Sequence, residues 1–331
     1  MKTVTHKLLS CLLVAVMLLG LLPMTVFAEE TTIASEPIDI AGSNMTLGNE
    51  LEVNFMAKKT DLTATGCTAV ITQTKADGST VVTELTEDKW GTLGPYHVMS
   101  ARIAAKEMAD PLSIEIFDAD GNVLNAPYTS SVRDYAGRAL AASSTTELVA
   151  TMMVDMLNYG SSAQVEFGYN TADLANNALT EAQQALATAK VACTNDQIKG
   201  TNAAGANLSL EDRIEMNVYF SGMKNKTPSE MYAVISFTDY LGNAKETRVE
   251  GSEFIKRNNT TYGVVVDDIV LADARQMVSV TVYDADGSEF GDASDSVSSY
   301  VARAEANDAD GSGLYSNILK FATSAYNYLV A

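Results

Sequence analysis

The stretch SIEIFDADGNVL occupies residues 113–124, and SVTVYDADGSEF occupies residues 279–290, 166 positions later (279 − 113). In both stretches polar and apolar residues alternate before the same Asp-Ala-Asp-Gly sequence. Such alternation is typical of a half-buried strand, and Asp-Gly is typical of a tight turn because glycine accepts a positive φ. The repeated phrase therefore predicts the same strand and turn at two places in the chain.

The repetition extends well beyond these twelve residues. NMTLGNELEVN at 44–54 aligns without gaps with NLSLEDRIEMN at 207–217, a spacing of 163 (207 − 44). SVRDYAGRA at 131–139 aligns with SVSSYVARA at 296–304, a spacing of 165 (296 − 131). Ordered matches at a nearly constant spacing are the signature of an internal repeat, so the sequence predicts two copies of one module.

The expected copies are residues 37–170 and 205–331. Each contains five or six segments that alternate like strands, followed by two segments with the 3.6-residue period of helices. Residues 171–204 between them are rich in alanine, asparagine and glutamine and predict a partly helical linker. The expected fold class is α+β, with tandem, mainly antiparallel β modules that each end in a two-helix segment. A sheet covered by helices is the first choice, and a small β-sandwich with appended helices is the second.

The first 28 residues predict a secretory signal peptide. Lys2 and Lys7 precede a long apolar run at 8–22, and small residues at Val26 and Ala28 suit signal peptidase. No later stretch has the roughly 18 apolar residues that a membrane span requires. The sequence therefore predicts a secreted, extracellular protein, with attachment to the cell wall as a further option.

The charge of the chain disfavours some classes of partner. Cleavage would remove two of the 22 basic residues and none of the 42 acidic ones, which leaves a net charge of −22 (20 − 42). Such a field repels nucleic acid and anionic membrane surfaces. Two cysteines would remain, Cys67 and Cys193, which allow either one disulfide or small buried thiols.

The two Asp-Ala-Asp-Gly sequences raise the question of calcium. A twelve-residue calcium loop places glycine at its sixth position and an acidic residue at its twelfth. Counted from Asp118 or Asp284, the sixth residue is valine or glutamate. We therefore predict turns and no required cofactor, and we keep Asp118, Asp120, Asp284 and Asp286 only as candidates for weak calcium binding.

The chain is poorly equipped for nucleophilic catalysis. The expected mature chain has one histidine, His97, and none of the common hydrolase motifs. Carboxylates are abundant, and Asp267 with Asp268 or Asp118 with Asp120 could act as the acid and base of a glycosidase. An exported hydrolase of that type is the alternative function.

Aromatic residues recur at matching places in the two copies. Trp90 aligns with Phe254 (254 − 90 = 164), and Tyr96 aligns with Tyr262 (262 − 96 = 166). The simpler interpretation is packing in the core. The other is an exposed patch on each copy that binds a sugar ring or a protein, so these four residues are the candidate ligand-binding residues.

A second group of residues lies in the predicted helix pair at 131–176. Its members are DYA at 134–136, LNYG at 157–160, AQ at 163–164 and FGYN at 167–170. The combination resembles a motif of tandem-module secreted and cell-surface proteins of Gram-positive, gut-type bacteria. The resemblance implies an extracellular module without an assigned activity and supplies no catalytic residue. The second copy departs from the motif, with Ser-Ala-Tyr at 324–326 in place of Asn-Tyr-Gly.

Taken together, these features predict a secreted, non-catalytic protein that binds or displays, with carbohydrate or a cell-surface protein as its partner. A structural spacer would have the same sequence features. Within the helix pair, Gly160 is expected on the buried face of its helix, because glycine costs about 1 kcal/mol relative to alanine in a helix. Tyr135 and Phe167 are the neighbours expected to approach it.

Overall fold

The computed structural model describes residues 37–48, 50–62, 64–307 and 309–331. The predicted signal peptide at 1–28 lies outside these residues. The described chain contains helices and four sheets, and every pair of neighbouring strands in the sheets is antiparallel. The predicted α+β class with mainly antiparallel sheets is therefore confirmed.

The part of the chain before residue 171, here called the first half, forms two four-stranded sheets. The strands of one, in the order β1-β2-β6-β5, are β1 (Ile40–Leu47), β2 (Leu51–Lys58), β6 (Tyr96–Ile103) and β5 (Gly91–Leu93). The strands of the other, in the order β4-β3-β7-β8, are β4 (Thr80–Thr86), β3 (Thr68–Thr74), β7 (Leu112–Phe117) and β8 (Tyr128–Ser130).

The part after residue 197, here called the second half, also forms two sheets. The order β10-β11-β15-β14 comprises β10 (Ala203–Ser209), β11 (Glu215–Phe220), β15 (Tyr262–Val266) and β14 (Ile255–Lys256). The order β13-β12-β16-β17-β9 comprises β13 (Ala244–Glu250), β12 (Tyr232–Thr238), β16 (Val278–Tyr283), β17 (Glu289–Asp295) and β9 (Ile198–Lys199).

The two sheets of the first half lie against each other. Phe55 on β2 is fully buried, and its ring lies 5.9 Å from that of Tyr128 on β8 in the other sheet. The inward residues of both sheets belong to one hydrophobic core. A single sheet covered by helices was therefore the wrong first choice, because each half divides its strands between two sheets, as in the second expected arrangement.

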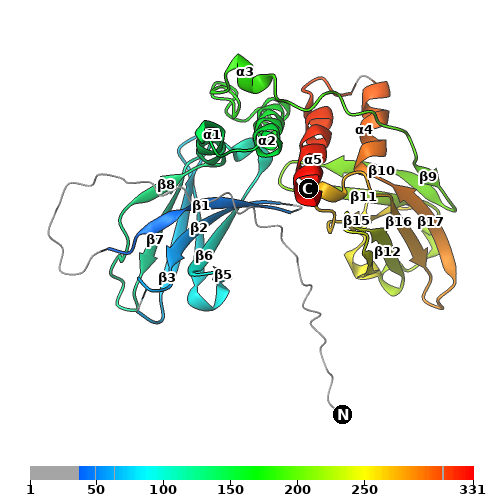
Figure 1. The fold of residues 1–331 in the computed structure, drawn as a ribbon. Helices are drawn as coiled ribbons and strands as arrows, with labels where there is room; N and C mark the ends of the chain where they lie inside the picture. The colour runs from blue at the N-terminus through cyan, green and yellow to red at the C-terminus, as the bar shows by residue number, and fades with distance from the viewer. Residues whose placement is uncertain (1–36, 49, 63, 308) are drawn as a thin grey trace, which may run out of the picture.

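The helices gather along one side of the molecule (Figure 1). They are α1 (Val132–Ala141), α2 (Glu147–Glu166), α3 (Glu181–Gln184), α4 (Val297–Ala306) and α5 (Leu314–Val330). Ser131 caps α1, since its hydroxyl accepts a hydrogen bond from the Asp134 N–H, and Ser296 caps α4 in the same way.

Helices α2 and α5 lie side by side where the two halves meet (Figure 1). The ring of Tyr159 on α2 lies 6.1 Å from that of Phe321 on α5, and Asn317 Nδ2 donates to Ser162 Oγ at 2.7 Å. The two helices therefore join the halves through a shared apolar core with polar contacts beside it.

Gly160 is buried on α2, as predicted, but its neighbours are different. A Cβ atom at this position would lie 2.5 Å from the sulfur of Met108 and 3.2 Å from the carbonyl oxygen of Ala105. Both belong to the segment around the short 3-10 helix η2 (Ala105–Glu107), which packs against α2. The expected neighbours, Tyr135 and Phe167, are not the groups that occupy the space left by the absent Cβ atom.

Candidate binding surface

A row of aromatic and charged side chains crosses the second half on one face of a sheet. Tyr232 on β12 stacks on Tyr283 on β16, with ring centroids 5.0 Å apart and planes inclined by 16°. The guanidinium carbon of Arg248 on β13 lies 3.6 Å from the centroid of the Tyr232 ring. We call Arg248, Tyr232 and Tyr283 the tyrosine ladder.

The strand register produces this ladder. Tyr232 lies directly opposite Tyr283 on one side and Glu250 on the other. Ala233 and Ile235 alternate with Tyr232 along β12 and are buried in the core, so Tyr232 points to the opposite, outer face. Arg248 and Glu250 are more than half exposed and hold each other in place, because Arg248 Nε donates to Glu250 Oε1 at 2.7 Å.

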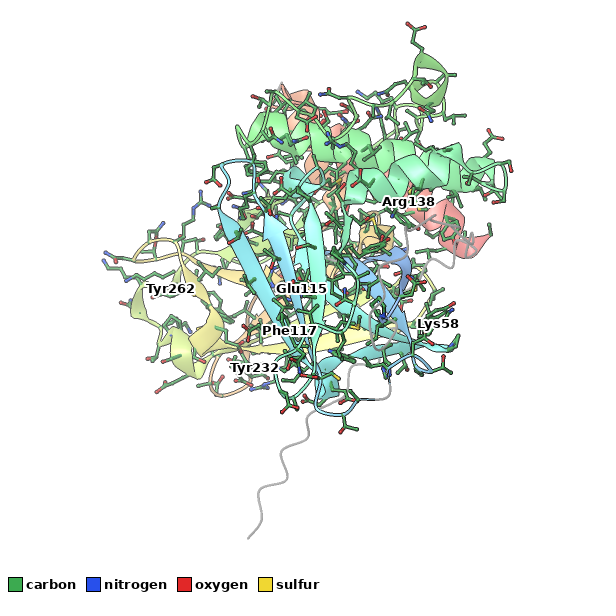
Figure 2. All side chains as sticks on the ribbon, turned by 90° about the vertical axis from the view of Figure 1, so that its left-hand side faces the viewer. Lys58, Glu115, Phe117, Arg138, Tyr232 and Tyr262 are labelled. Carbon is green, nitrogen blue, oxygen red and sulfur yellow. The ribbon has the colours of Figure 1, made fainter. Side chains whose placement is uncertain are left out.

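The first half has no such ladder at the aligned positions. Thr68 aligns with Tyr232 (232 − 68 = 164), Glu84 aligns with Arg248 (248 − 84 = 164), and Phe117 aligns with Tyr283 (283 − 117 = 166). Glu115 and Phe117 follow each other along β7, on the side of the molecule that faces the viewer in Figure 2. The outer faces of the two halves are thus chemically different.

Two of the four predicted ligand-binding residues are buried. Trp90 and Phe254 each have only 8% of their surface exposed. The Trp90 indole nitrogen donates to the carbonyl of Leu85 at 2.9 Å, and its ring meets the His97 ring edge-on at 5.5 Å. The prediction of an exposed platform at Trp90 and Phe254 is therefore wrong, because their rings complete the core.

Tyr96 and Tyr262 are half-buried and more accessible than Trp90 and Phe254. Tyr96 lies opposite Lys58 on β2, and Tyr262 lies opposite Lys256 on β14. Their sheets are not the sheet of the tyrosine ladder, and Tyr262 projects well apart from Tyr232 in Figure 2. The structure brings neither tyrosine together with the ladder, and their role in binding stays a prediction.

The Asp-Ala-Asp-Gly sequences form turns at strand ends, as predicted. Gly121 and Gly287 have φ values of 84° and 82°, and each donates its N–H to the carbonyl of the aspartate three residues before it. Asp118 accepts hydrogen bonds from the backbone of Asp120 and Asn122. These bonds lower the pKa of Asp118, led by those from Asn122.

The second turn engages its carboxylates in a similar way. Asp284 pairs with Lys226 at 2.7 Å, and Asp286 accepts hydrogen bonds from the hydroxyl and the N–H of Ser288. Among the residues that the structure describes, no group of three or more histidine, cysteine, aspartate or glutamate side chains is placed to hold a metal ion. Weak calcium binding stays a prediction for titration.

The remaining candidates for chemistry lie apart. Cys67 is buried and Cys193 is half-buried, and both are free thiols, so the structure contains no bond between them. Asp267 lies 3.5 Å from Arg213, whereas Asp268 accepts a hydrogen bond from Thr247. Asp267 thus contacts the segment before β11, whereas Asp268 contacts β13.

A buried carboxylate pair that the sequence did not reveal lies beside η2. Gln73 Nε2 donates to Glu107 Oε2 and to Asp110 Oδ2, both at 3.0 Å. Lys75 lies 2.8 Å from Glu107, and Tyr169 donates its hydroxyl to Asp110 at 2.6 Å. Glu107 and Asp110 have exposed fractions of 6% and 2%. No local pattern marks this pair, because its partners come from two distant segments, at 73–75 and at Tyr169.

The two carboxyl groups of this pair have opposite pKa shifts. Burial opposes the ionisation of Glu107, but the hydrogen bonds from Gln73 and Lys75 outweigh it and lower the pKa. Burial raises the pKa of Asp110, since the bonds from Tyr169 and Gln73 offset only part of the cost of desolvation. Opposite shifts in a carboxyl pair are also a feature of acid–base catalysts.

The motif residues at 157–170 fasten the chain that follows α2. Gln164 is fully buried, accepts a hydrogen bond from the Ala175 N–H at 2.7 Å and donates to the Asp173 carbonyl at 3.1 Å. Asn176 donates to Asn158 at 2.8 Å. Together with the Tyr169–Asp110 bond, these contacts give the motif a structural role.

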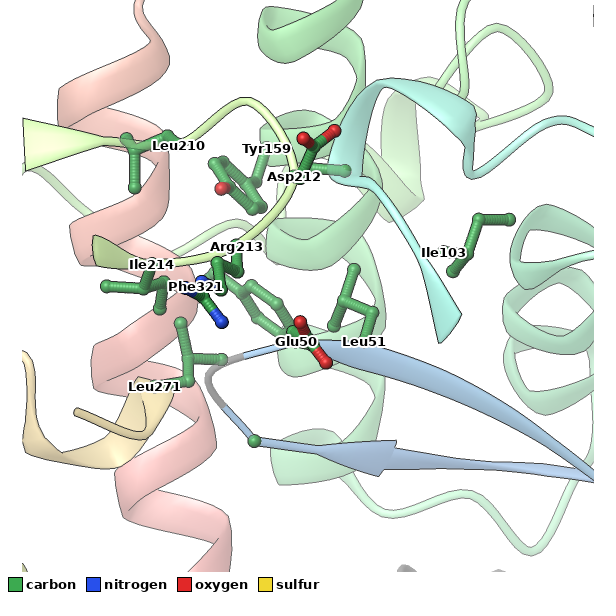
Figure 3. A pocket seen from close by; sticks show the side chains of 12 residues that line it. Glu50, Leu51, Ile103, Tyr159, Leu210, Asp212, Arg213, Ile214, Leu271 and Phe321 are labelled. Carbon is green, nitrogen blue, oxygen red and sulfur yellow. The ribbon is translucent and has the colours of Figure 1, made fainter. Parts of the chain in front are cut away.

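The junction of the halves contains a cavity of about 20 Å³, with Tyr159 and Phe321 in its wall (Figure 3). This volume accommodates about one water molecule. A wider hollow of about 360 Å³ adjoins it, lined by Ser209, Arg213 and the four acidic residues Glu50, Glu211, Asp212 and Glu215. Glu50, Glu211 and Glu215 pair with Arg102, Lys106 and Arg213 at 2.8, 2.8 and 3.1 Å. The hollow is therefore a site of ion pairs between nearby segments.

No family model matches the chain, and no curated protein is significantly similar to it. No helix within the described residues is long and apolar enough to cross a membrane.

Proposed function

We propose that this chain is a secreted, non-catalytic binding protein made of two tandem copies of one module, and that it recognises another protein through the tyrosine ladder. The extracellular location rests on the sequence at 1–28. The tandem copies rest on strand order and on a shared β-bulge, and the mode of recognition rests on the contacts of the ladder.

The strand order supports a duplication. Adding nine to the order β1-β2-β6-β5 gives β10-β11-β15-β14, and adding nine to β4-β3-β7-β8 gives β13-β12-β16-β17. The additional strand β9 lies at the edge of the latter sheet, beside β17. Two matching strand orders are not expected of unrelated halves, so they favour a duplication.

A shared irregularity supports the same inference. The register of β1 against β2 shifts between Ile40 and Gly42, and that of β10 against β11 shifts between Ala203 and Gly205. Both glycines have positive φ values, of 146° and 119°. They are 163 residues apart (205 − 42), the spacing of the sequence alignment at this place. A β-bulge retained at an aligned position favours common descent of the two halves.

The tyrosine ladder is the observation that carries the binding function. Tyrosine and arginine dominate the energetics of many protein interfaces, and tyrosine offers a large contact area at a low cost in side-chain entropy. The ladder is held by stacking and by the Arg248–Glu250 pair before any partner arrives. Little ordering is then required on binding.

The ladder favours a protein over a carbohydrate. A sugar stacks on an open ring face, but Arg248 covers one face of Tyr232 and Tyr283 covers the other. The ring edges, the hydroxyl groups and the charged Arg248 remain for contact. Such a surface suits a polar protein partner that accepts hydrogen bonds.

A binding array tests the proposal. The mature chain would be applied to purified bacterial surface proteins and glycans, together with the variants Tyr232→Ala and Arg248→Ala. We expect binding to at least one protein, weakened about tenfold or more by each substitution, as for a hot spot. Thr68→Ala, at the position of the first half that aligns with Tyr232 (232 − 68 = 164), is the matched control. Binding only to glycans, or binding that the ladder variants leave unchanged, would contradict the proposal.

An exported hydrolase is the second candidate, and the Glu107–Asp110 pair is its one specific observation. The opposite pKa shifts suit an acid and a base, but both groups are buried and already bonded to Gln73, Lys75 or Tyr169. Hydrolysis of chromogenic glycosides that is lost in Glu107→Gln, with the fold retained, would support this candidate over binding.

A further inference from the structure

Strand β4 forms an open edge of the first half. It is the terminal strand of the order β4-β3-β7-β8 and pairs only with β3 in that sheet. Its sequence is TVVTELT, with a single charged residue, Glu84. Val81 and Val82 are 44% and 52% exposed. A strand with this composition is a template for pairing with a further strand.

The register shows which backbone groups of β4 are open. Lys75 N donates to Ser79 O at 2.8 Å and closes the hairpin. Hydrogen-bonded pairs alternate along an antiparallel ladder, so Val81 and Thr83 bond to β3. The N–H and C=O groups of Thr80, Val82 and Glu84 consequently point away from the sheet.

The aligned edge of the second half is protected. Strand β13 occupies the same place in its sheet, and its sequence AKETRVE contains four charged residues. Lys245, which aligns with Val81 (245 − 81 = 164), lies opposite Phe237, on the side of β13 that faces the core. An inward charge on an edge strand is a known device against unwanted pairing. The β13 edge is therefore protected by charge against pairing with a further strand, and the β4 edge is not.

From this contrast we infer that β4 is a docking edge for an extended segment of another polypeptide, which adds to the sheet as an antiparallel strand. The backbone groups of Thr80, Val82 and Glu84 would supply the hydrogen bonds. This site lies in the first half and does not depend on the tyrosine ladder, which lies in the second.

Charge identifies the kind of segment. Glu84 is on the edge itself, and Glu115 lies two strands away on the same outer face, since both pair with Val70. A lysine or arginine opposite Glu84 would form a favourable cross-strand pair. A second copy of the chain brings its own excess of negative charge, −20 for the full sequence, and is disfavoured. The occupant is therefore a basic segment that alternates lysine with valine or threonine.

A peptide titration of the mature chain tests the inference. The probe is a fluorescent nine-residue peptide that alternates lysine with valine and threonine. Two analogues accompany it, one with glutamate in place of lysine and one N-methylated on the amides that would face β4. We expect the probe to bind and each analogue to bind at least about tenfold more weakly. Binding of the N-methylated analogue equal to that of the probe would overturn a backbone ladder, as would no binding of the probe up to about 1 mM.

Matched proline variants locate the site. Val82→Pro removes an outward N–H and leaves the bonds to β3 intact, as proline is tolerated on an edge strand. Glu246→Pro makes the same change on β13 (246 − 82 = 164). We expect Val82→Pro to weaken the probe about tenfold or more and Glu246→Pro to leave it unchanged, with melting curves checking the fold. Equal effects of the two variants on probe binding would show that the probe does not bind at β4. A dimer in sedimentation that Val82→Pro dissociates would show that the edge binds a second copy of the chain and not a basic segment.

Discussion

The two halves place a buried carboxylate at the same backbone position and stabilise it in different ways. Glu107 is the last residue of η2. Asp273 occupies the aligned position (273 − 107 = 166), as the last residue of the 3-10 helix η6 (Leu271–Asp273). Glu107 is neutralised by Lys75 at 2.8 Å. The residue that aligns with Lys75 in the second half is Asp239 (239 − 75 = 164), so a second negative charge replaces the positive one.

The second half compensates from another strand. Lys245 on β13 lies 3.4 Å from Asp239, and the Asp239 carboxylate also accepts the N–H groups of Leu241 and Asn243. Lys245 is thus both the inward charge that protects the β13 edge and the counter-ion of a buried aspartate. A single charge reversal, from Lys75 to Asp239, thus goes together with a neutralising lysine on another strand and with a charged edge strand.

The strongest test of how far the halves are independent is the helix junction. Phe321 is fully buried and contacts Tyr159 across the interface. Phe321→Ala should lower the free energy of unfolding by about 3–5 kcal/mol, because the cavity and the lost burial add together. Chemical denaturation measures it, and Val330→Ala, at a position that is 49% exposed, is the control. A loss below about 1 kcal/mol would mean that the helices hardly couple the halves.

A second comparison concerns two aligned, buried asparagines. Asn54 donates to Asn44 at 2.8 Å and to Thr46 at 2.9 Å, and it accepts from Ser100 at 2.6 Å. The side-chain oxygen of Asn217 is buried and has no hydrogen-bond partner. The Asn217 nitrogen donates to Glu215 at 3.2 Å, and Glu215 keeps its pairing with Arg213 when this bond is lost. Asn54→Leu should cost about 1–3 kcal/mol because it orphans buried partners, whereas Asn217→Leu should cost less than about 1 kcal/mol. Thermal melts of both variants decide it, and equal costs would contradict the contrast.

These asparagines show where reading the sequence fails. Local signals correctly indicated the turns at Asp118 and Asp284, because each turn depends on residues within a few positions. Asn54 is a polar residue between the apolar residues Val53 and Phe55, and Asn44 on the neighbouring strand supplies it with a buried partner that no local pattern contains. The burial of the Asn54 side chain therefore depends on the pairing of β2 with β1.

The candidate site was harder to predict for the same reason. Tyr232 and Tyr283 are 51 residues apart in the chain (283 − 232) and meet only through the β12–β16 register. The aligned aromatics Trp90 and Phe254 drew attention because they recur, but recurrence reflected a shared core position. The ladder has no counterpart in the first half, so a comparison of repeats could not reveal it.

The third test compares one aligned position on two helices. Gly160 on α2 lies against Met108 and Ala105, whereas Tyr326 on α5 (326 − 160 = 166) is 38% exposed. Gly160→Leu should cost about 1–3 kcal/mol through overpacking, and Tyr326→Leu should change stability by no more than about 0.5 kcal/mol. Thermal melts compare the two. If Gly160→Leu were tolerated, η2 would have to move away from α2 at little cost.

The smallest expected effect tests the two carboxylates through pH. Burial raises the pKa of Asp273 to about 6, the charge of Asp239 adds to the shift, and the Tyr240 N–H and Lys245 oppose it. The folded protein therefore keeps a proton that the unfolded chain releases near its ordinary pKa of 3.8, so the free energy of unfolding falls as pH rises from about 4 to about 6.

Asp273→Asn removes this loss, because asparagine does not ionise and can still accept the Tyr240 N–H. We expect the variant to be about 1 kcal/mol more stable than the wild type at pH 7, since one pKa unit is worth about 1.4 kcal/mol and nearby groups relax. Its advantage should vanish by about pH 4.

Glu107→Gln should behave in the opposite way. The pKa of Glu107 is lowered, so the contribution of its carboxylate to stability is present above the ordinary value of 4.5 and disappears on acidification. Urea denaturation of both variants from pH 4 to pH 7 separates the cases, and stabilisation of both or neither at pH 7 would show that the two halves handle the buried charge alike.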